Sequence, residues 1–192
     1  MEIIPYPHPT LRHKSKPLRR VNNELKEMVK QMFALMYKAN GVGLAANQVD
    51  LPFQLFIVNE KADPQEGEEL VFINPVITKP KGRESKEEGC LSIPGIHEDV
   101  DRPTQIHVSA YALDGTPIEK TFDGMLARII QHEFDHLQGT LFVDRIAEST
   151  FKQIDGLLEE FEIDFQALQA SGKYGSNEEI KARLQKLEKE FC

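Results

Sequence analysis

The stretch HEFDH at positions 132–136 carries the sharpest chemical signal in the sequence. On a helix, residues four positions apart lie on one face about 6 Å apart along the axis, so His132 and His136 can bind one metal ion. Glu133 stands one residue further along, where its carboxylate can accept a proton from water at that metal. The alternative is a histidine pair without a metal, but the pattern favours a metal site with its own general base.

Two histidines do not complete such a site, because catalytic zinc-like centres use three protein ligands and keep a further position for water. The other four histidines all precede this stretch, whereas several acids follow it. Cys90, in the segment EEGCLSIPG at 87–95, is the other candidate. A lone cysteine is more often a small buried hydrophobe, and a loop cysteine can also act as a nucleophile. Spacing alone therefore leaves the third ligand open.

The helix that must carry these histidines is predicted at 124–138, where apolar residues follow helical spacing and Gly139 ends the run. A helix at 22–40 is predicted in the same way, with Asn22 or Asn23 as its cap. Two more helices are expected at about 150–169 and, after a Gly- and Ser-rich break, at 177–191.

Strands are predicted where short β-branched or aromatic runs end at Pro, Gly, Asn or Asp. These runs occupy residues 53–58, 70–78, 105–113 and 117–122, and an Asp-Gly turn joins the last two. The acidic stretch at 60–69 reads as a solvated loop. One helix, then antiparallel strands, then further helices is the order of an α+β fold rather than an alternating α/β fold.

The chain has 192 residues and a formal net charge of −8. Such a surface repels phosphate backbones, so DNA binding is not expected. No apolar run approaches the roughly 18 residues of a membrane span, so no membrane partner is expected either. Two cysteines and the lack of an apolar signal segment indicate a reducing cytoplasm.

Three motifs together resemble the signature of the peptide deformylases: GVGLAANQ at 41–48, EGCLS at 88–92 and QHEFDHLQG at 131–139. They stand in the order and at the separations usual for that family. The resemblance implies an α+β fold in which antiparallel strands pack around a central metal-binding helix, with a C-terminal helix. It also implies a catalytic domain over residues 1–170, followed by a charged helical tail over 171–192.

The resemblance implies removal of the N-formyl group from the N-terminal methionine of newly synthesised polypeptides, with release of formate. By the same resemblance, Cys90, His132 and His136 bind one divalent metal ion, Fe²⁺ natively, with Zn²⁺, Ni²⁺ or Co²⁺ also accepted. A metal-bound water attacks the formyl carbon, and Glu133 is the general base and acid. The side-chain amide of Gln48 and the backbone N–H of Leu91 meet the growing negative charge on the formyl oxygen.

Smaller assignments concern the substrate. Val42, Leu91 and Ile129 are expected to form walls of the methionine side-chain pocket, although a plain core role for Ile129 is nearly as plausible. Gly43 is expected to let the substrate backbone approach closely, or to supply a positive φ at a turn. At the position of His97, some family members place an arginine that helps to hold the peptide, and this sequence departs from that pattern.

Three charged residues lie near the candidate ligands in the sequence. Glu88 and Arg102 resemble a family pair that braces the cysteine segment; without the resemblance both would read as surface charges. Asp135 is expected either to orient a ligand or to be an exposed helix acid.

The tail admits three interpretations. Mixed charges favour a solvated helix, apolar residues such as Leu184 and Phe191 could pack on the body or a second subunit, and the resemblance suggests ribosome docking. The family also points to a bacterial cytoplasm. Two other functions stay open at this stage: a metallopeptidase with a different third ligand, and a catalytically silent relative that keeps the fold.

Overall fold

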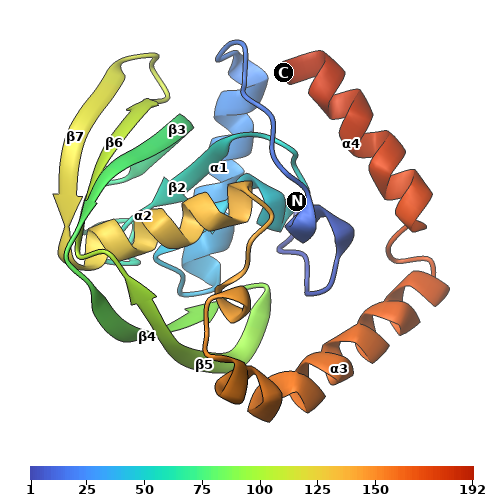
Figure 1. Ribbon diagram of the computed structural model, residues 1–192. Helices are drawn as coiled ribbons and strands as arrows, with labels where there is room; N and C mark the ends of the chain where they lie inside the picture. Colours follow the sequence, from blue (N-terminus) through green and yellow to red (C-terminus); the bar gives the residue numbers. More distant parts are fainter.

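The computed structural model describes all 192 residues and contains a five-stranded antiparallel sheet (Figure 1). The strand order is β1-β2-β3-β6-β7, and the strands span Gly43–Ala45, Leu55–Val58, Leu70–Lys81, Gln105–Tyr111 and Pro117–Asp123. A second, two-stranded sheet is the hairpin of β4 (Glu84–Cys90) and β5 (Ile93–Arg102). The α+β class predicted from the order of elements is confirmed.

Four α-helices surround and cross these sheets: α1 (Asn23–Lys38), α2 (Gly124–Leu137), α3 (Glu148–Ala170) and α4 (Asn177–Phe191). Three short 3₁₀ helices complete the fold: η1 (Pro9–Arg12), η2 (Ala46–Val49) and η3 (Phe142–Asp144). Figure 1 shows α2 crossing the middle of the molecule, whereas α3 and α4 form an outer arc. None of the helices has the length and apolarity needed to span a lipid bilayer.

The central helix α2 is buried on two sides. Apolar residues such as Ala127, Ile130 and Leu137 pack in one cluster with the sheet residues Phe56 and Phe72. The two phenylalanine rings stack with centroids 4.9 Å apart and form an aromatic surface on this face of the sheet. The rest of α2 carries polar side chains that are buried as well, and these face the candidate site.

The helix α1 forms for the reasons that its sequence suggests. The Asn22 side chain accepts a hydrogen bond from the Leu25 N–H at 2.8 Å and so caps the first turn. Its apolar stripe, including Val29, Met32 and Met36, packs against β1 and β2 in the largest core cluster. Its C-terminal end leads directly into the segment 41–48, which contributes to the candidate site.

The hairpin β4-β5 was not predicted. The residues of β4 are charged or small, with little β-propensity, and most of them are exposed, so neither composition nor alternation indicated a strand. Their partner β5 supplies the buried apolar positions Ile93, Ile96 and Val100. Cys90 is therefore the last residue of a strand, opposite Ile93, rather than a residue of an open loop.

The helix α4 packs on the body of the protein. Phe191 is only 3% exposed and lies against Phe53, with ring centroids 5.0 Å apart, and Ile180 and Leu184 are buried too. Glu188 pairs with His13 at 2.7 Å, and Arg183 forms an ion pair with Asp50. Of the three interpretations of the tail, the structure shows packing on the body, with mixed charges on the outer face.

We expect Phe191→Ala to lower the free energy of unfolding by about 3 kcal/mol, because it leaves a cavity against Phe53 in the main core. Urea unfolding followed by circular dichroism measures the change. Leu157→Ala on α3 is the control, since Leu157 is 47% exposed and should lose little stability. Equal stability of the two variants would show that α4 is not part of the cooperative core.

Candidate metal centre

Three metal-binding side chains meet where the hairpin approaches α2. Cys90 comes from the end of β4, and His132 and His136 come from successive turns of α2. Their ligand atoms all lie within 4.8 Å of one another, and Cys90 Sγ is 3.4 Å from His136 Nε2. A thiolate and two imidazoles suit a divalent first-row metal, and three protein ligands are the number that catalytic sites use. The donor set therefore fits the metal that the sequence predicts.

The carboxylate of Glu88 orients this site. It accepts hydrogen bonds from Arg102 Nε at 2.6 Å and Nη2 at 2.8 Å, and from Arg128 Nη1 at 2.7 Å. It also lies 3.0 Å from His132 Nδ1. If Nδ1 donates to Glu88, the lone pair of His132 Nε2 is free for a metal, the arrangement common among histidine ligands. Although burial opposes it, hydrogen bonding to Arg102 and His132 lowers the pKa of Glu88 to about 2, so the carboxylate is ionised.

The charged network continues behind the helix. Arg102 also donates to Asp135 at 2.8 Å, and Asp135 forms an ion pair with Arg145. Arg102 is 3% exposed and Asp135 5% exposed, so both are core residues. The reading of Glu88 and Arg102 as surface charges, and of Asp135 as an exposed acid, is therefore wrong. All three are buried because each charge has partners of opposite sign.

Glu133 lies on the same helix, 4% exposed. Burial raises the pKa of its carboxyl group to about 7, and its Oε2 atom has no hydrogen-bond partner. A buried oxygen without a partner is unusual and points to a role in chemistry. Burial also lowers the pKa of His136, which favours the neutral imidazole that a metal requires.

Gln48 reaches the site from η2. Its Oε1 accepts a hydrogen bond from the Ala45 N–H at 2.8 Å, which fixes the orientation of the amide. Its Nε2 then points toward Cys90 Sγ and Ser92 Oγ, each at 3.4 Å. A side-chain donor is thus held beside the thiol, in the cavity where a substrate oxygen would arrive.

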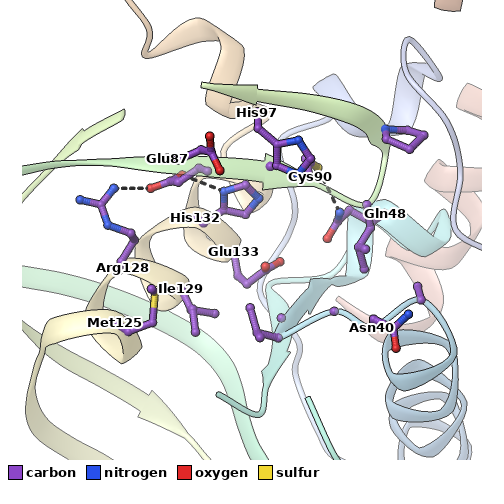
Figure 2. A pocket seen from close by; sticks show the side chains of 18 of the residues that line it. Asn40, Gln48, Glu87, Cys90, His97, Met125, Arg128, Ile129, His132 and Glu133 are labelled. Carbon is purple, nitrogen blue, oxygen red and sulfur yellow. Dashed lines mark hydrogen bonds and ion pairs between the residues drawn. The ribbon is translucent and has the colours of Figure 1, made fainter. Parts of the chain in front are cut away.

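A cavity of about 540 Å³ opens onto these groups (Figure 2). Every substrate residue expected from the sequence lines it: Val42, Gly43, Leu91 and Ile129. His136, by contrast, lies behind this lining. The sequence did not single out Asn40, Met125 and Arg128, which also line the cavity. An i−4 spacing from His132 was the only available signal for Arg128.

The structure gives a more specific reason for a glycine at position 43 than either of the two expectations from the sequence. It is the first residue of β1, and its φ lies outside the positive range, so the turn interpretation is wrong. A Cβ at this position would lie 2.5 Å from Glu133 Oε1. The missing side chain therefore gives room to the Glu133 carboxylate itself.

A buried carboxyl group and an oriented amide donor beside three convergent metal ligands are the groups that a metal-dependent hydrolase needs. The polypeptide deformylase family model matches residues 1–152. A peptide deformylase of Rhodopirellula baltica is 47% identical over 172 residues, 90% of this chain and 86% of that protein. The chloroplastic peptide deformylase 1B of Solanum lycopersicum is 43% identical over 155 residues, 80% of this chain and 56% of that longer protein.

Solved structures agree with these sequence matches. Peptide deformylase 1B of Arabidopsis thaliana, in complex with an inhibitor, superposes with a TM-score of 0.84 and is 39% identical, covering 92% of this chain and 97% of that one. The enzyme of Synechococcus elongatus in complex with actinonin superposes with a TM-score of 0.76 at 39% identity, over 90% and 88% of the two chains. The chain belongs to the peptide deformylase family, and its activity is that of a peptide deformylase.

We expect Gly43→Ala to reduce kcat roughly ten- to a hundredfold, because the new methyl group must displace the Glu133 carboxylate. The melting temperature should change little, since the carboxylate is the flexible end of a side chain. Gly156→Ala is the control, since Gly156 lies within α3 with open space around it, and alanine there should stabilise the helix by up to about 1 kcal/mol. Normal turnover in Gly43→Ala would refute the steric argument.

Proposed function

We propose that this chain removes the formyl group from N-formylmethionyl peptides with Cys90, His132 and His136 as metal ligands and Glu133 as general base and acid. One observation carries the proposal: the buried, unpartnered carboxyl group of Glu133 lines the same cavity as Cys90 and His132, and His136 completes the cluster of ligand atoms. When bound, a divalent cation there polarises a carbonyl oxygen and lowers the pKa of water at its open position.

Glu133 performs the proton transfers. With a pKa of about 7, its carboxylate can take a proton from the attacking water at neutral pH. The same carboxyl group then passes that proton to the methionine nitrogen as the C–N bond breaks, so the nitrogen leaves as a neutral amine. Formate and a free amino terminus are the products.

The formyl oxygen gains negative charge during the attack. The donors that we assign to it are Gln48 Nε2, 3.4 Å from Cys90 Sγ, and the backbone N–H of Leu91, the residue after Cys90. Each donor of this kind is worth about 3 kcal/mol of transition-state stabilisation. The bond from Ala45 to Gln48 Oε1 supports this role, because a preoriented amide needs no rearrangement during the reaction.

The methionine side chain needs an apolar wall. Val42 and Ile129, with Leu91 and Met125, supply apolar surface along the cavity. Val42 is 37% and Met125 47% exposed, which is consistent with surfaces that a substrate covers. Gly43 lines the same cavity, and we assign to it the close approach of the substrate backbone.

The choice of metal and compartment is also part of the proposal. A thiolate ligand softens the site and suits Fe²⁺, while Zn²⁺, Ni²⁺ and Co²⁺ accept the same donors. Both cysteines are free thiols in the structure, and oxidation of Cys90 would remove a ligand. A reducing compartment such as the bacterial cytoplasm therefore suits the protein, although several plant relatives are named chloroplastic.

Formate release from a formyl-Met peptide by the Fe²⁺ or Ni²⁺ enzyme tests the activity, and internal peptide fragments would instead indicate a metallopeptidase.

Glu133→Gln should retain the metal, measured by elemental analysis, while kcat falls about 10²–10⁴-fold. Glu160→Gln on the exposed side of α3 is the control and should match the wild type. Substantial turnover by Glu133→Gln would remove Glu133 from the proton-transfer role.

We also propose that the tail docks on the ribosome through the exposed lysines of α4. The outer face of α4 exposes Lys181, Lys186 and Lys189, while its apolar face packs on the body. Truncation of α4 would remove Phe191 from the core, so charge reversal is the cleaner test of this proposal.

Reversal of these three lysines to glutamate should lower co-sedimentation with ribosomes several-fold, because RNA phosphates would then be repelled. Turnover of a short formylated peptide should not change. The matched control reverses three exposed lysines of α1, Lys26, Lys30 and Lys38. If both triple variants co-sediment like the wild type, the tail is not the docking surface.

A further inference from the structure

The candidate ligands come from two parts of the fold that share no backbone hydrogen-bond ladder. Cys90 belongs to the β4-β5 hairpin, whose strands pair only with each other. His132 and His136 belong to α2, which packs on the five-stranded sheet. Side-chain contacts between the hairpin and α2 therefore help to determine the position of the thiol relative to the imidazoles.

Arg128 joins these two parts through three acceptors. From the second turn of α2, its Nη1 donates to Glu88 Oε1 at 2.7 Å and to the Val100 carbonyl at 2.8 Å. Its Nη2 donates to the Glu84 carbonyl at 2.7 Å. Glu84 and Glu88 lie on β4, and Val100 lies on β5. One guanidinium thus links α2 to β4 and β5 together.

The spacing on the helix makes this link specific to the metal site. Arg128 precedes His132 by four residues, so both side chains point toward β4 from one face of α2 (Figure 2). They hold the two oxygens of one carboxylate: Arg128 contacts Glu88 Oε1 and His132 contacts Oε2. Glu88 itself lies two residues before Cys90 on the same strand.

We propose that Arg128 is a positioning residue of the metal site, which sets the register between the hairpin that carries Cys90 and the helix that carries the two histidines. Arg128 is 5% exposed and lines the substrate cavity. The planar guanidinium group is required for these contacts. A lysine ammonium is a compact point charge and cannot reach all three acceptors in this geometry. The inference rests on the ligand set of the proposed function.

Titration of apo protein with Co²⁺ tests this inference without substrate. We expect Arg128→Met to bind Co²⁺ about tenfold more weakly, as replacement of outer partners of metal ligands commonly does. The thiolate-to-cobalt charge-transfer band should weaken or shift, because Cys90 no longer sits at its usual distance. In the loaded enzyme, kcat should fall by a larger factor than any rise in KM.

Gln131→Leu is the matched control. Gln131 is also buried on α2 and donates to the Pro103 carbonyl at 3.0 Å, but it does not contact Glu88. This variant should lower the melting temperature while Co²⁺ affinity and spectrum stay as in the wild type. Arg128→Lys retains the charge and serves if Arg128→Met fails to fold; it should bind Co²⁺ more weakly than the wild type.

The outcomes separate the two proposals. A wild-type protein without a thiolate-to-cobalt band would overturn the ligand set, and with it this inference. A wild-type band that survives unchanged in Arg128→Met, together with unchanged affinity, would overturn the role of Arg128 alone. A lysine variant identical to the wild type would show that charge suffices and would contradict the cross-link.

Discussion

The structure around the candidate metal centre depends on one buried carboxylate, that of Glu88. Two guanidinium groups and one imidazole contact it: Arg102 from β5, and Arg128 and His132 from successive turns of α2. A single unpaired carboxylate at this depth would be strongly destabilising, so the three partners and the carboxylate require one another. Because Glu88 is two residues from Cys90 and contacts His132, this charged cluster also aligns the ligand of the β4-β5 hairpin with the ligands of α2.

The central helix makes that arrangement possible. Its apolar side packs on the phenylalanine side chains of the five-stranded sheet, and its polar side is buried against the hairpin. Because α2 is packed on both sides, the surrounding core determines the direction in which its two histidines point. The same burial shifts the pKa of Glu133 toward neutrality, so the fold that positions the base also tunes it.

The sequence predicted the regular elements well. The helices at 22–40, 124–138, 150–169 and 177–191 all occur, each within about two residues of its predicted bounds, because amphipathic spacing and capping residues are local properties. The strand predicted at 105–113 ends at Tyr111, since the Ala112 N–H closes the turn to Thr116. The hairpin β4-β5 escaped prediction because its stability comes from partners elsewhere, not from the propensity of its charged residues.

Burial of charge was likewise invisible in the sequence. Arg102, Arg128 and Asp135 look like ordinary surface residues until their partners, distant in the chain, are known. The reason for Gly43 was equally hidden, because the side chain that would meet a methyl group there is ninety residues away.

By itself, the sequence determined the chemistry that this protein can perform. Residue types and local spacing specify two imidazoles on one helix face and a carboxyl group one residue further along, and the three motifs specify the family. Only the tertiary structure decided how the third ligand arrives, which charges are buried and where the tail lies. These depend on contacts between residues far apart in the chain, and local spacing carries no information about such contacts.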